Sequence, residues 1–245
     1  MSVEWIIADV DGCITPEESV AWDLGLFSRF AQTVRSGSLP PMTLCTGRPQ
    51  PYVEVLMKLF DIGGPAICEN GAVFYSLDDN HAWYGPGVTE AKIIALRELR
   101  MFVETDVLPG EPDAFMQFGK EAQFSVFSKK PDIFPRIKDR IDAFVQAHES
   151  VEVVVTESHY YLNVSLEGVD KGNALRALLN ELGVEPHNVA GIGDTAGDLP
   201  LRDNVGFFAA PANAQPAIKS VADYVSPYPT LEGMLDILKH KQIAG

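Results

Sequence analysis

Apolar residues in this chain occur in two patterns, short continuous runs and longer stretches with helical spacing. The run Val3–Val10 is almost entirely apolar, which is typical of a strand buried on both faces inside a parallel sheet. The next stretch, Ser19–Val34, repeats its apolar residues at the spacing of one helix face. The same alternation then continues, with predicted strands at Met42–Cys45, Pro65–Cys68 and Ala72–Tyr75 and a predicted helix that begins near Pro51.

The pattern changes after about His81. Gly85-Pro86-Gly87 has the composition of a hinge, and the residues that follow no longer alternate strand with helix. Two predicted strands flank a turn at Ser158-His159 and therefore run antiparallel. The elements expected here are helices at Ala91–Val103 and Asp132–His148 and strands at Gln123–Ser128, Val151–Thr156 and Tyr160–Ser165. We interpret residues 82–165 as an inserted α+β domain.

Strand and helix alternate again after Gly168. The predicted helices are Lys171–Leu182, Ala214–Val221 and Leu231–Lys239, and the predicted strands are Asn188–Ile192, Val205–Ala209 and Tyr224–Ser226. The predicted fold class is therefore α/β, with a Rossmann-like, doubly wound and mostly parallel sheet as the core. Residues 1–81 and 166–245 would form this core, and residues 82–165 would form the inserted α+β domain.

Charge and composition narrow the function. The chain has 245 residues and a formal net charge of −15, without a run of Lys or Arg, so neither a nucleic acid nor a membrane surface is expected as partner. The N-terminus lacks a signal peptide and no apolar stretch reaches about 20 residues, so we expect a cytoplasmic protein. The chain has three cysteines, Cys13, Cys45 and Cys68. Their odd number and the absence of CxxC spacing argue against a disulfide framework and against a zinc site. The sequence does not predict an oligomeric state.

Reactive side chains follow several of the predicted strands. Parallel α/β sheets bind ligands at the carboxyl ends of their strands, so these side chains are expected to meet in one crevice. Carboxylates gathered at one place repel each other unless a cation lies between them, and oxygen ligands favour Mg²⁺. The residues concerned are Asp9 and Asp11 after the first strand, Thr46 after the second, Lys171 at a helix start, and Asp194 with Asp198 after a later strand.

Such a cluster is suited to phosphoryl transfer. A carboxylate such as Asp9 can attack phosphorus and form an acyl-phosphate, and Asp11 can move the protons. Lys171 and Thr46 can hold phosphate oxygens, together with the backbone N–H groups of the Gly47 turn. Simpler interpretations remain open at this stage. The aspartates can cap a turn, Thr46 can cap a helix, Arg48 can lie on the surface, and Asn213 can be a turn former.

Four ordered motifs resemble those of the haloacid dehalogenase superfamily of phosphatases. They are Asp9-Val10-Asp11-Gly12, Thr46-Gly47-Arg48-Pro49, Lys171-Gly172, and Gly193-Asp194 followed by Asp198. The resemblance implies that Asp9 is the nucleophile and Asp11 the acid/base, and that Thr46 and Lys171 bind phosphate. It also implies that Mg²⁺ is bound by Asp9, Asp194 and the Asp11 backbone carbonyl, with support from Asp198.

The insertion between the second and third motifs is similar to that of the C2-capped, Cof-like branch, whose members act mostly on sugar phosphates and other small phosphates. Glu69-Asn70-Gly71-Ala72 and Ala212-Asn213-Ala214 resemble that branch too, so Arg48, Asn70 and Asn213 are candidate substrate contacts. The stretch from Gly64 to Gly71 looks like archaeal-type phosphoglycolate phosphatases. Cys13 and Gly197 depart from the family pattern, which often has Thr and Asn there.

The expected activity is hydrolysis of a small phosphorylated metabolite. A phosphomutase that returns the phosphate to a sugar is an alternative, because it uses the same acyl-phosphate. A receiver-like signalling module that holds phosphate on Asp9 is a further alternative, although the large insertion and Asp11 argue against it.

Overall fold

The structure is a computed structural model that describes residues 3–16, 20–148, 152–158 and 160–244. It divides into two compact units, a core unit of Met1–Pro86 with Asp170–Gly245 and a cap unit of Gly87–Val169. Three residues used in the predictions lie outside the described ones. They are Ser19 and Val151, each the first residue of a predicted element, and His159 in a predicted turn.

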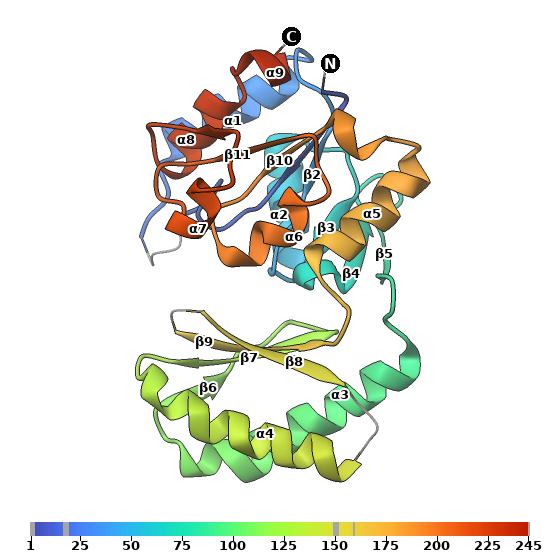
Figure 1. The fold of residues 1–245 in the computed structure, drawn as a ribbon, viewed down its shortest axis with the longest axis vertical. Coiled ribbons are helices and arrows are strands. Elements are labelled where there is room, and N and C mark those ends of the chain that lie inside the picture. Colours follow the sequence, from blue (N-terminus) through green and yellow to red (C-terminus); the bar gives the residue numbers. More distant parts are fainter. Residues whose placement is uncertain (1–2, 17–19, 149–151, 159, 245) are drawn as a thin grey trace. The chain divides into compact units, whose positions relative to one another are not determined.

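The core unit is built on a five-stranded parallel sheet with the order β12-β11-β10-β1-β2, which confirms the predicted Rossmann-like fold. Strand β1 lies between β10 and β2, so the N-terminal and C-terminal parts of the chain both contribute to the centre of the sheet (Figure 1). The strands are β1 (Trp5–Ala8), β2 (Met42–Leu44), β10 (Val189–Ile192), β11 (Phe207–Ala210) and β12 (Tyr224–Val225).

A three-stranded antiparallel sheet continues the core unit beyond β2. It consists of β3 (Ala66–Cys68), β4 (Val73–Ser76) and β5 (His81–Tyr84), and the bridge between Cys45 and Ile67 links it to the parallel sheet. The predicted hairpin around Asn70-Gly71 is present as a 3₁₀ turn, Glu69–Gly71, between β3 and β4.

Helices cover both faces of the parallel sheet. On one face, α5, α6 and α7 pack on a buried cluster that includes Ile7 and Phe208. On the other face, Phe27 and Phe30 of α1 contact Phe60 of α2, and α8 packs beside α1. The helices are α1 (Leu24–Arg35), α2 (Gln50–Phe60), α5 (Lys171–Leu182), α6 (Leu199–Arg202), α7 (Pro216–Lys219), α8 (Thr230–Ile237) and α9 (Lys241–Ala244).

The cap unit has two layers. Its antiparallel sheet has the order β6-β7-β9-β8, and α3 and α4 cover one face of it (Figure 1). A π-helical turn, Val103–Val107, continues α3. The elements are α3 (Glu90–Phe102), β6 (Ala114–Met116), β7 (Gln123–Ser128), α4 (Phe134–His148), β8 (Val153–Ser158) and β9 (Tyr161–Leu166).

The unit boundaries lie after Pro86 and Val169 rather than after residues 81 and 165. The first boundary is later because β5 pairs with β4 of the core unit, and the Gly85 N–H still donates to the Ala72 carbonyl. The second is later because β9 ends only at Leu166, after which Asp170 caps helix α5. The sequence missed β5 and β6, which are short and carry no clear alternation.

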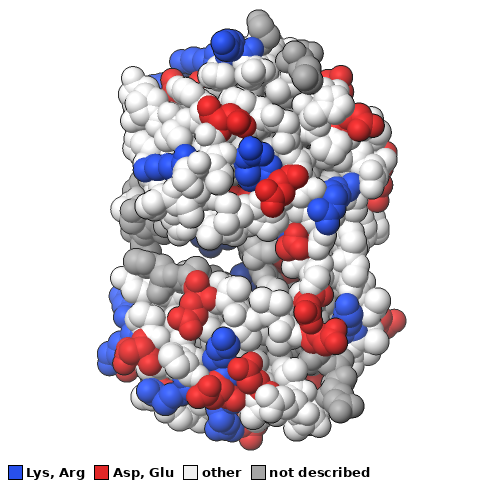
Figure 2. Space-filling view, viewed as in Figure 1, with Lys and Arg blue, Asp and Glu red and all other residues white. Residues whose placement is uncertain are grey.

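The visible surface of each unit carries acidic and basic side chains that are interspersed rather than gathered by sign (Figure 2). Within the residues that the structure describes, no helix is long and apolar enough to cross a membrane.

Candidate active site

Strand β1 ends at Ala8, and Asp9 follows directly. The Asp9 backbone N–H donates to the Ile192 carbonyl at 2.9 Å, which continues the pairing with β10. The Asp9 carboxylate accepts a hydrogen bond of 2.7 Å from the Val10 N–H, and Asp9 is only 5% exposed. The end of a central strand therefore fixes this carboxylate in a buried position, as the sequence predicted for a parallel sheet.

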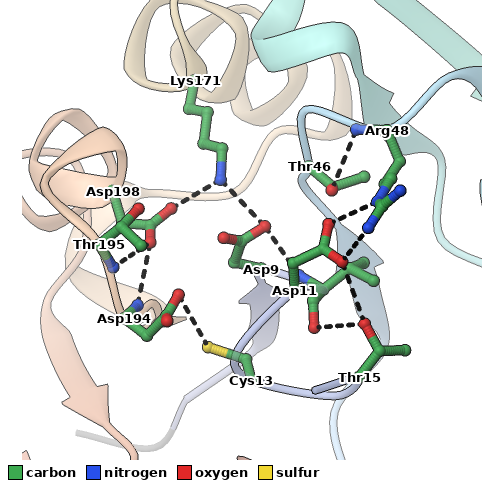
Figure 3. A network of polar contacts seen from close by, with 11 residues as sticks. Asp9, Asp11, Cys13, Thr15, Thr46, Arg48, Lys171, Asp194, Thr195 and Asp198 are labelled. Atoms are coloured by element: carbon green, nitrogen blue, oxygen red, sulfur yellow. Dashed lines mark hydrogen bonds and ion pairs between the residues drawn. The ribbon is translucent and has the colours of Figure 1, made fainter. Parts of the chain in front are cut away.

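Lys171, the first residue of helix α5, places its ammonium group between two carboxylates (Figure 3). Its Nζ lies 3.0 Å from Asp9 Oδ1 and 2.7 Å from Asp198 Oδ1. Burial lowers the pKa of Lys171, but Asp198 and Asp9 outweigh burial and hold that pKa well above its usual value. A cation is unfavourable at a helix N-terminus, so these two carboxylates are what keeps a charged lysine here.

The same surroundings raise the pKa of Asp9 from 3.8 to about 7. Burial is the largest cause, and the negative charge of Asp198 adds to it, while Lys171 acts in the opposite direction. Without further positive charge, the site therefore holds Asp9 partly protonated near neutral pH.

Asp198 shapes the loop that carries Asp194. Its Oδ2 accepts hydrogen bonds from the Asp194 N–H at 2.9 Å and the Thr195 N–H at 3.1 Å, while its Oδ1 contacts Lys171. Thr195 and Asp198 form a reciprocal capping box at the start of this turn. Both Asp198 oxygens are engaged by the protein, so this residue orients the loop that carries Asp194.

Three buried carboxylates meet at the strand ends. Oxygens of Asp9, Asp194 and Asp198 lie within 4.8 Å of one another. Gly12 permits this approach, because a Cβ on it would lie 2.0 Å from Asp194 Oδ2, and its φ of +77° is left-handed. The donor set consists of hard oxygens next to a single ammonium group, which fits Mg²⁺. Cys13 places its Sγ 4.0 Å from Asp194 Oδ1.

Asp11 is paired with Arg48. The guanidinium donates from Nε to Asp11 Oδ2 and from a terminal nitrogen to Oδ1, each at 2.7 Å (Figure 3). It also stacks over the Tyr52 ring. The Thr15 hydroxyl adds a bond of 3.3 Å to the same carboxylate. The Arg48 side chain is 35% exposed and paired with Asp11, and its role as a substrate contact stays a prediction. Thr15 and Tyr52 were not predicted, and nothing in their local sequence distinguishes them.

Thr46 follows β2 and is fully buried. Its hydroxyl accepts from the Arg48 N–H at 3.2 Å, and its carbonyl accepts from the Asn70 N–H at 2.9 Å. Glu69 and Asn70 both have left-handed φ values, 50° and 55°. This strained turn brings the Asn70 amide against Gly47, where a Cβ would lie 3.1 Å from the amide oxygen. The loop that contains Thr46 and Gly47 therefore packs against the turn that contains Asn70.

Asn213 joins two backbone segments. Its amide donates to the Gly12 carbonyl at 2.9 Å and accepts from the Thr230 N–H at 2.7 Å. The neighbouring Gln215, which the sequence did not single out, receives the Ala196 N–H on its side chain and donates its own N–H to the Asp194 carbonyl. Asn213 thus contacts the loop after β1, and Gln215 contacts the loop that carries Asp194.

Comparison with known proteins finds similarity of the chain to a known family. Residues 111–238, just over half of the chain, match the model of the haloacid dehalogenase-like hydrolases. A phosphoglycolate phosphatase of Methanothrix thermoacetophila is 25% identical over 99% of both chains. A crystal structure from Thermoplasma acidophilum covers 98% of each chain at 22% identity with a TM-score of 0.75. A sugar phosphatase of subclass IIB covers 97% of this chain and 98% of its own at 14% identity, with a TM-score of 0.68.

The chain belongs to the haloacid dehalogenase-like hydrolase family. Its core and cap have the fold of the Cof-like branch. The resemblance stated from the four motifs is thereby confirmed.

Proposed function

We propose that this protein is a magnesium-dependent phosphatase that hydrolyses a small phosphate monoester through an aspartyl-phosphate on Asp9. The observation that carries the proposal is the position of the Asp9 carboxylate. It lies at the end of the central strand, 3.0 Å from the Lys171 ammonium and beside Asp194. A nucleophilic carboxylate, a cation for the phosphate oxygens and an oxygen site for a metal ion are thus adjacent.

The chemistry would proceed in two displacements. Asp9 attacks phosphorus, the ester P–O bond breaks, and Asp11 gives its proton to the leaving oxygen. Asp11 then takes a proton from water, the water oxygen attacks phosphorus, and inorganic phosphate leaves with Asp9 restored. The two hydrogen bonds from Arg48 fix the position of the Asp11 carboxylate beside Asp9.

The remaining residues would bind the phosphate and the metal ion. Thr46, the Gly47 N–H and Lys171 are the candidates for the phosphate oxygens. Asp9, Asp194 and the Asp11 backbone carbonyl would hold Mg²⁺, which offsets the negative charge of the phosphate. Asp198 would position Asp194 and Lys171, because both of its oxygens already contact them or their loop.

The substrate would be a small metabolite such as phosphoglycolate or a sugar phosphate. The names of the full-length relatives support the first, and that of a structural neighbour supports the second. We assign substrate selection to the cap unit, Gly87–Val169. A cytoplasmic location remains a proposal from the sequence.

The test is release of inorganic phosphate from a panel of small esters with and without Mg²⁺. Asp9→Asn should reduce turnover by roughly a thousandfold or more, because it removes the nucleophile. Asp203→Asn is the matched control, since Asp203 is exposed and lies outside the site. The proposal fails if Asp9→Asn retains activity. Isomerised sugar phosphate in place of free phosphate would assign a mutase instead.

A further inference from the structure

Arg48 lies between the Asp11 carboxylate and the ring of Tyr52. Its guanidinium makes two hydrogen bonds of 2.7 Å to Asp11, and its central carbon lies 4.9 Å from the centre of the Tyr52 ring. A guanidinium is planar, so a carboxylate at its edge and an aromatic ring against its central carbon together fix its position. Tyr52 therefore limits where Arg48 can hold Asp11.

Tyr52 also contacts Asp11 by a second route, through Thr15. The Thr15 hydroxyl donates to Asp11 Oδ1 at 3.3 Å (Figure 3). Burial raises the pKa of Tyr52 and the negative charge of Asp11 adds to this, whereas a hydrogen bond between the Tyr52 and Thr15 side chains lowers it. Four side chains thus form a closed ring of contacts, Asp11, Arg48, Tyr52 and Thr15, in which no member can move without disturbing its neighbours.

The helix layer of the core unit holds the Tyr52 ring in turn. Tyr52 is the third residue of α2, and the Trp22 ring meets it edge-on, with centroids 6.4 Å apart and an interplanar angle of 88°. Trp22 also stacks on Phe27 of α1 at 5.0 Å, and Phe27 is buried. Both geometries are favourable for aromatic pairs. A line of contacts therefore runs from the buried layer of α1 through Tyr52 to Asp11.

This arrangement fixes the direction in which Asp11 can present a proton. A carboxylate has about four lone-pair positions, two on each oxygen. Within the described residues, Arg48 and Thr15 both donate to Oδ1, while Oδ2 accepts only the Arg48 Nε–H. The position left for a proton is therefore on Oδ2. The side chains of Asp11 and Arg48 are 26% and 35% exposed, and ion pairs at such exposure contribute little to folding, so positioning is the main effect of the pair.

We propose that Tyr52 is a positioning residue for proton transfer by Asp11, and that it acts through Arg48 on one side and through Thr15 on the other. This inference rests on the proposed function, in which Asp11 protonates the leaving oxygen, and it adds a residue to that step. Loss of the Tyr52 ring should impair the departure of leaving groups that need a proton and spare those that do not.

The experiment compares two leaving groups in the full-length enzyme with Mg²⁺. One ester is the alkyl phosphate of the panel that the wild type hydrolyses fastest, and its alkoxide must take a proton to leave. The other is 4-nitrophenyl phosphate, whose nitrophenolate leaves without one. The quantity compared is kcat/KM, because it covers the steps up to the departure of the leaving group. Tyr52→Leu should lower kcat/KM of the alkyl ester by about ten- to a hundredfold and that of 4-nitrophenyl phosphate by less than about twofold.

Three further variants separate positioning from folding. Tyr52→Phe keeps the ring against Arg48 and should retain most of the activity on the alkyl ester. Tyr52→Met is a second variant without the ring and should show the same selective loss as Tyr52→Leu. Tyr84→Leu is the matched control, since Tyr84 is 43% exposed on β5 of the core unit, and it should leave both esters unaffected.

A double variant tests whether Tyr52 acts through Asp11. Asp11→Asn removes the group that carries the proton, so adding Tyr52→Leu to it should change kcat/KM of the alkyl ester by less than about twofold. Losses that multiply in the double variant would overturn the proposal, because Tyr52 would then act independently of Asp11.

An equal loss for both esters in Tyr52→Leu and Tyr52→Met would show a structural role only and would also overturn the positioning role. Either result leaves the phosphatase proposal standing, since the wild type is active in both. Absence of phosphate release by the wild type from every ester of the panel would instead overturn the proposed function, and with it the role of Asp11 that Tyr52 supports.

Discussion

The ion cluster around Lys171 allows the sharpest prediction. The substitution Lys171→Met keeps the apolar stem and removes the ammonium group between Asp9 and Asp198. The side chains of Lys171 and Asp198 are 5% and 0% exposed, so water cannot replace the lost charge. Asp9 and Asp198 would then share a buried site without a cation, and the pKa of Asp9, which Lys171 lowers, would rise further.

The expected cost in metal-free buffer at pH 7.5 is about 3–5 kcal/mol, the value for breaking a buried ion pair from one side. For a unit of this size, that corresponds to a melting temperature lower by roughly 10 °C. Lys171→Met with Asp198→Asn removes both charges and should recover a large part of the loss, so the two effects are not additive. Saturating Mg²⁺ should stabilise the single variant, because a cation returns to the carboxylates.

Thermal unfolding followed by circular dichroism, with EDTA and with Mg²⁺, measures each of these quantities. Lys219→Met is the control, since Lys219 is exposed on α7. A single variant that melts at the wild-type temperature in EDTA would refute the reasoning, as would a double variant that is less stable than the single one.

Two further predictions concern the metal site. Gly12→Ala should abolish most activity and weaken Mg²⁺ binding by about tenfold or more, because its Cβ would lie 2.0 Å from Asp194 Oδ2. Gly37→Ala has a similar φ of +69° but nothing within 4 Å, so it should cost only about 1 kcal/mol of stability and leave Mg²⁺ affinity intact; equal Mg²⁺ affinities of the two variants would contradict this. Because burial raises the pKa of Asp9 to about 7, Mg²⁺ must displace a proton at lower pH. Calorimetry should therefore show weaker Mg²⁺ binding at pH 6 than at pH 8, with protons released to the buffer. An Mg²⁺ affinity that does not change with pH would contradict the raised pKa of Asp9. In the absence of metal, the contribution of protonated Asp9 to folding stability should be greatest below pH 4 and be lost as the pH rises through about 7.

Part of this site could be predicted from the sequence. Asp9 and Asp194 follow buried apolar runs, and Lys171 begins a helix with a capping residue before it, so local patterns place them at one sheet edge. Long-range contacts could not be predicted in this way. The partner of Arg48 and the approach of Gly12 to Asp194 depend on how distant loops fold over the strand ends.

The sequence predicted a different start for one helix and missed two strands, and each difference has a physical reason. Helix α1 begins at Leu24 rather than Ser19, because the Asp23 side chain accepts the N–H groups of Gly25 and Leu26 and caps it there. Strands β5 and β6 owe their conformation to pairing with β4 and β7, and their own sequences show no strand period.

The position of β1 has a consequence for biosynthesis. Trp5 pairs with Val189, so the central strand of the core unit lacks one neighbour until the ribosome has made nearly four-fifths of the chain. The cap unit is continuous in sequence and emerges during this interval, so it can fold before the unit that precedes it. Asp9 can meet Lys171 and Asp198 only after those residues have been made. A nascent chain arrested before residue 171 therefore has a buried-strand aspartate without the ammonium group that lies beside it in the folded protein.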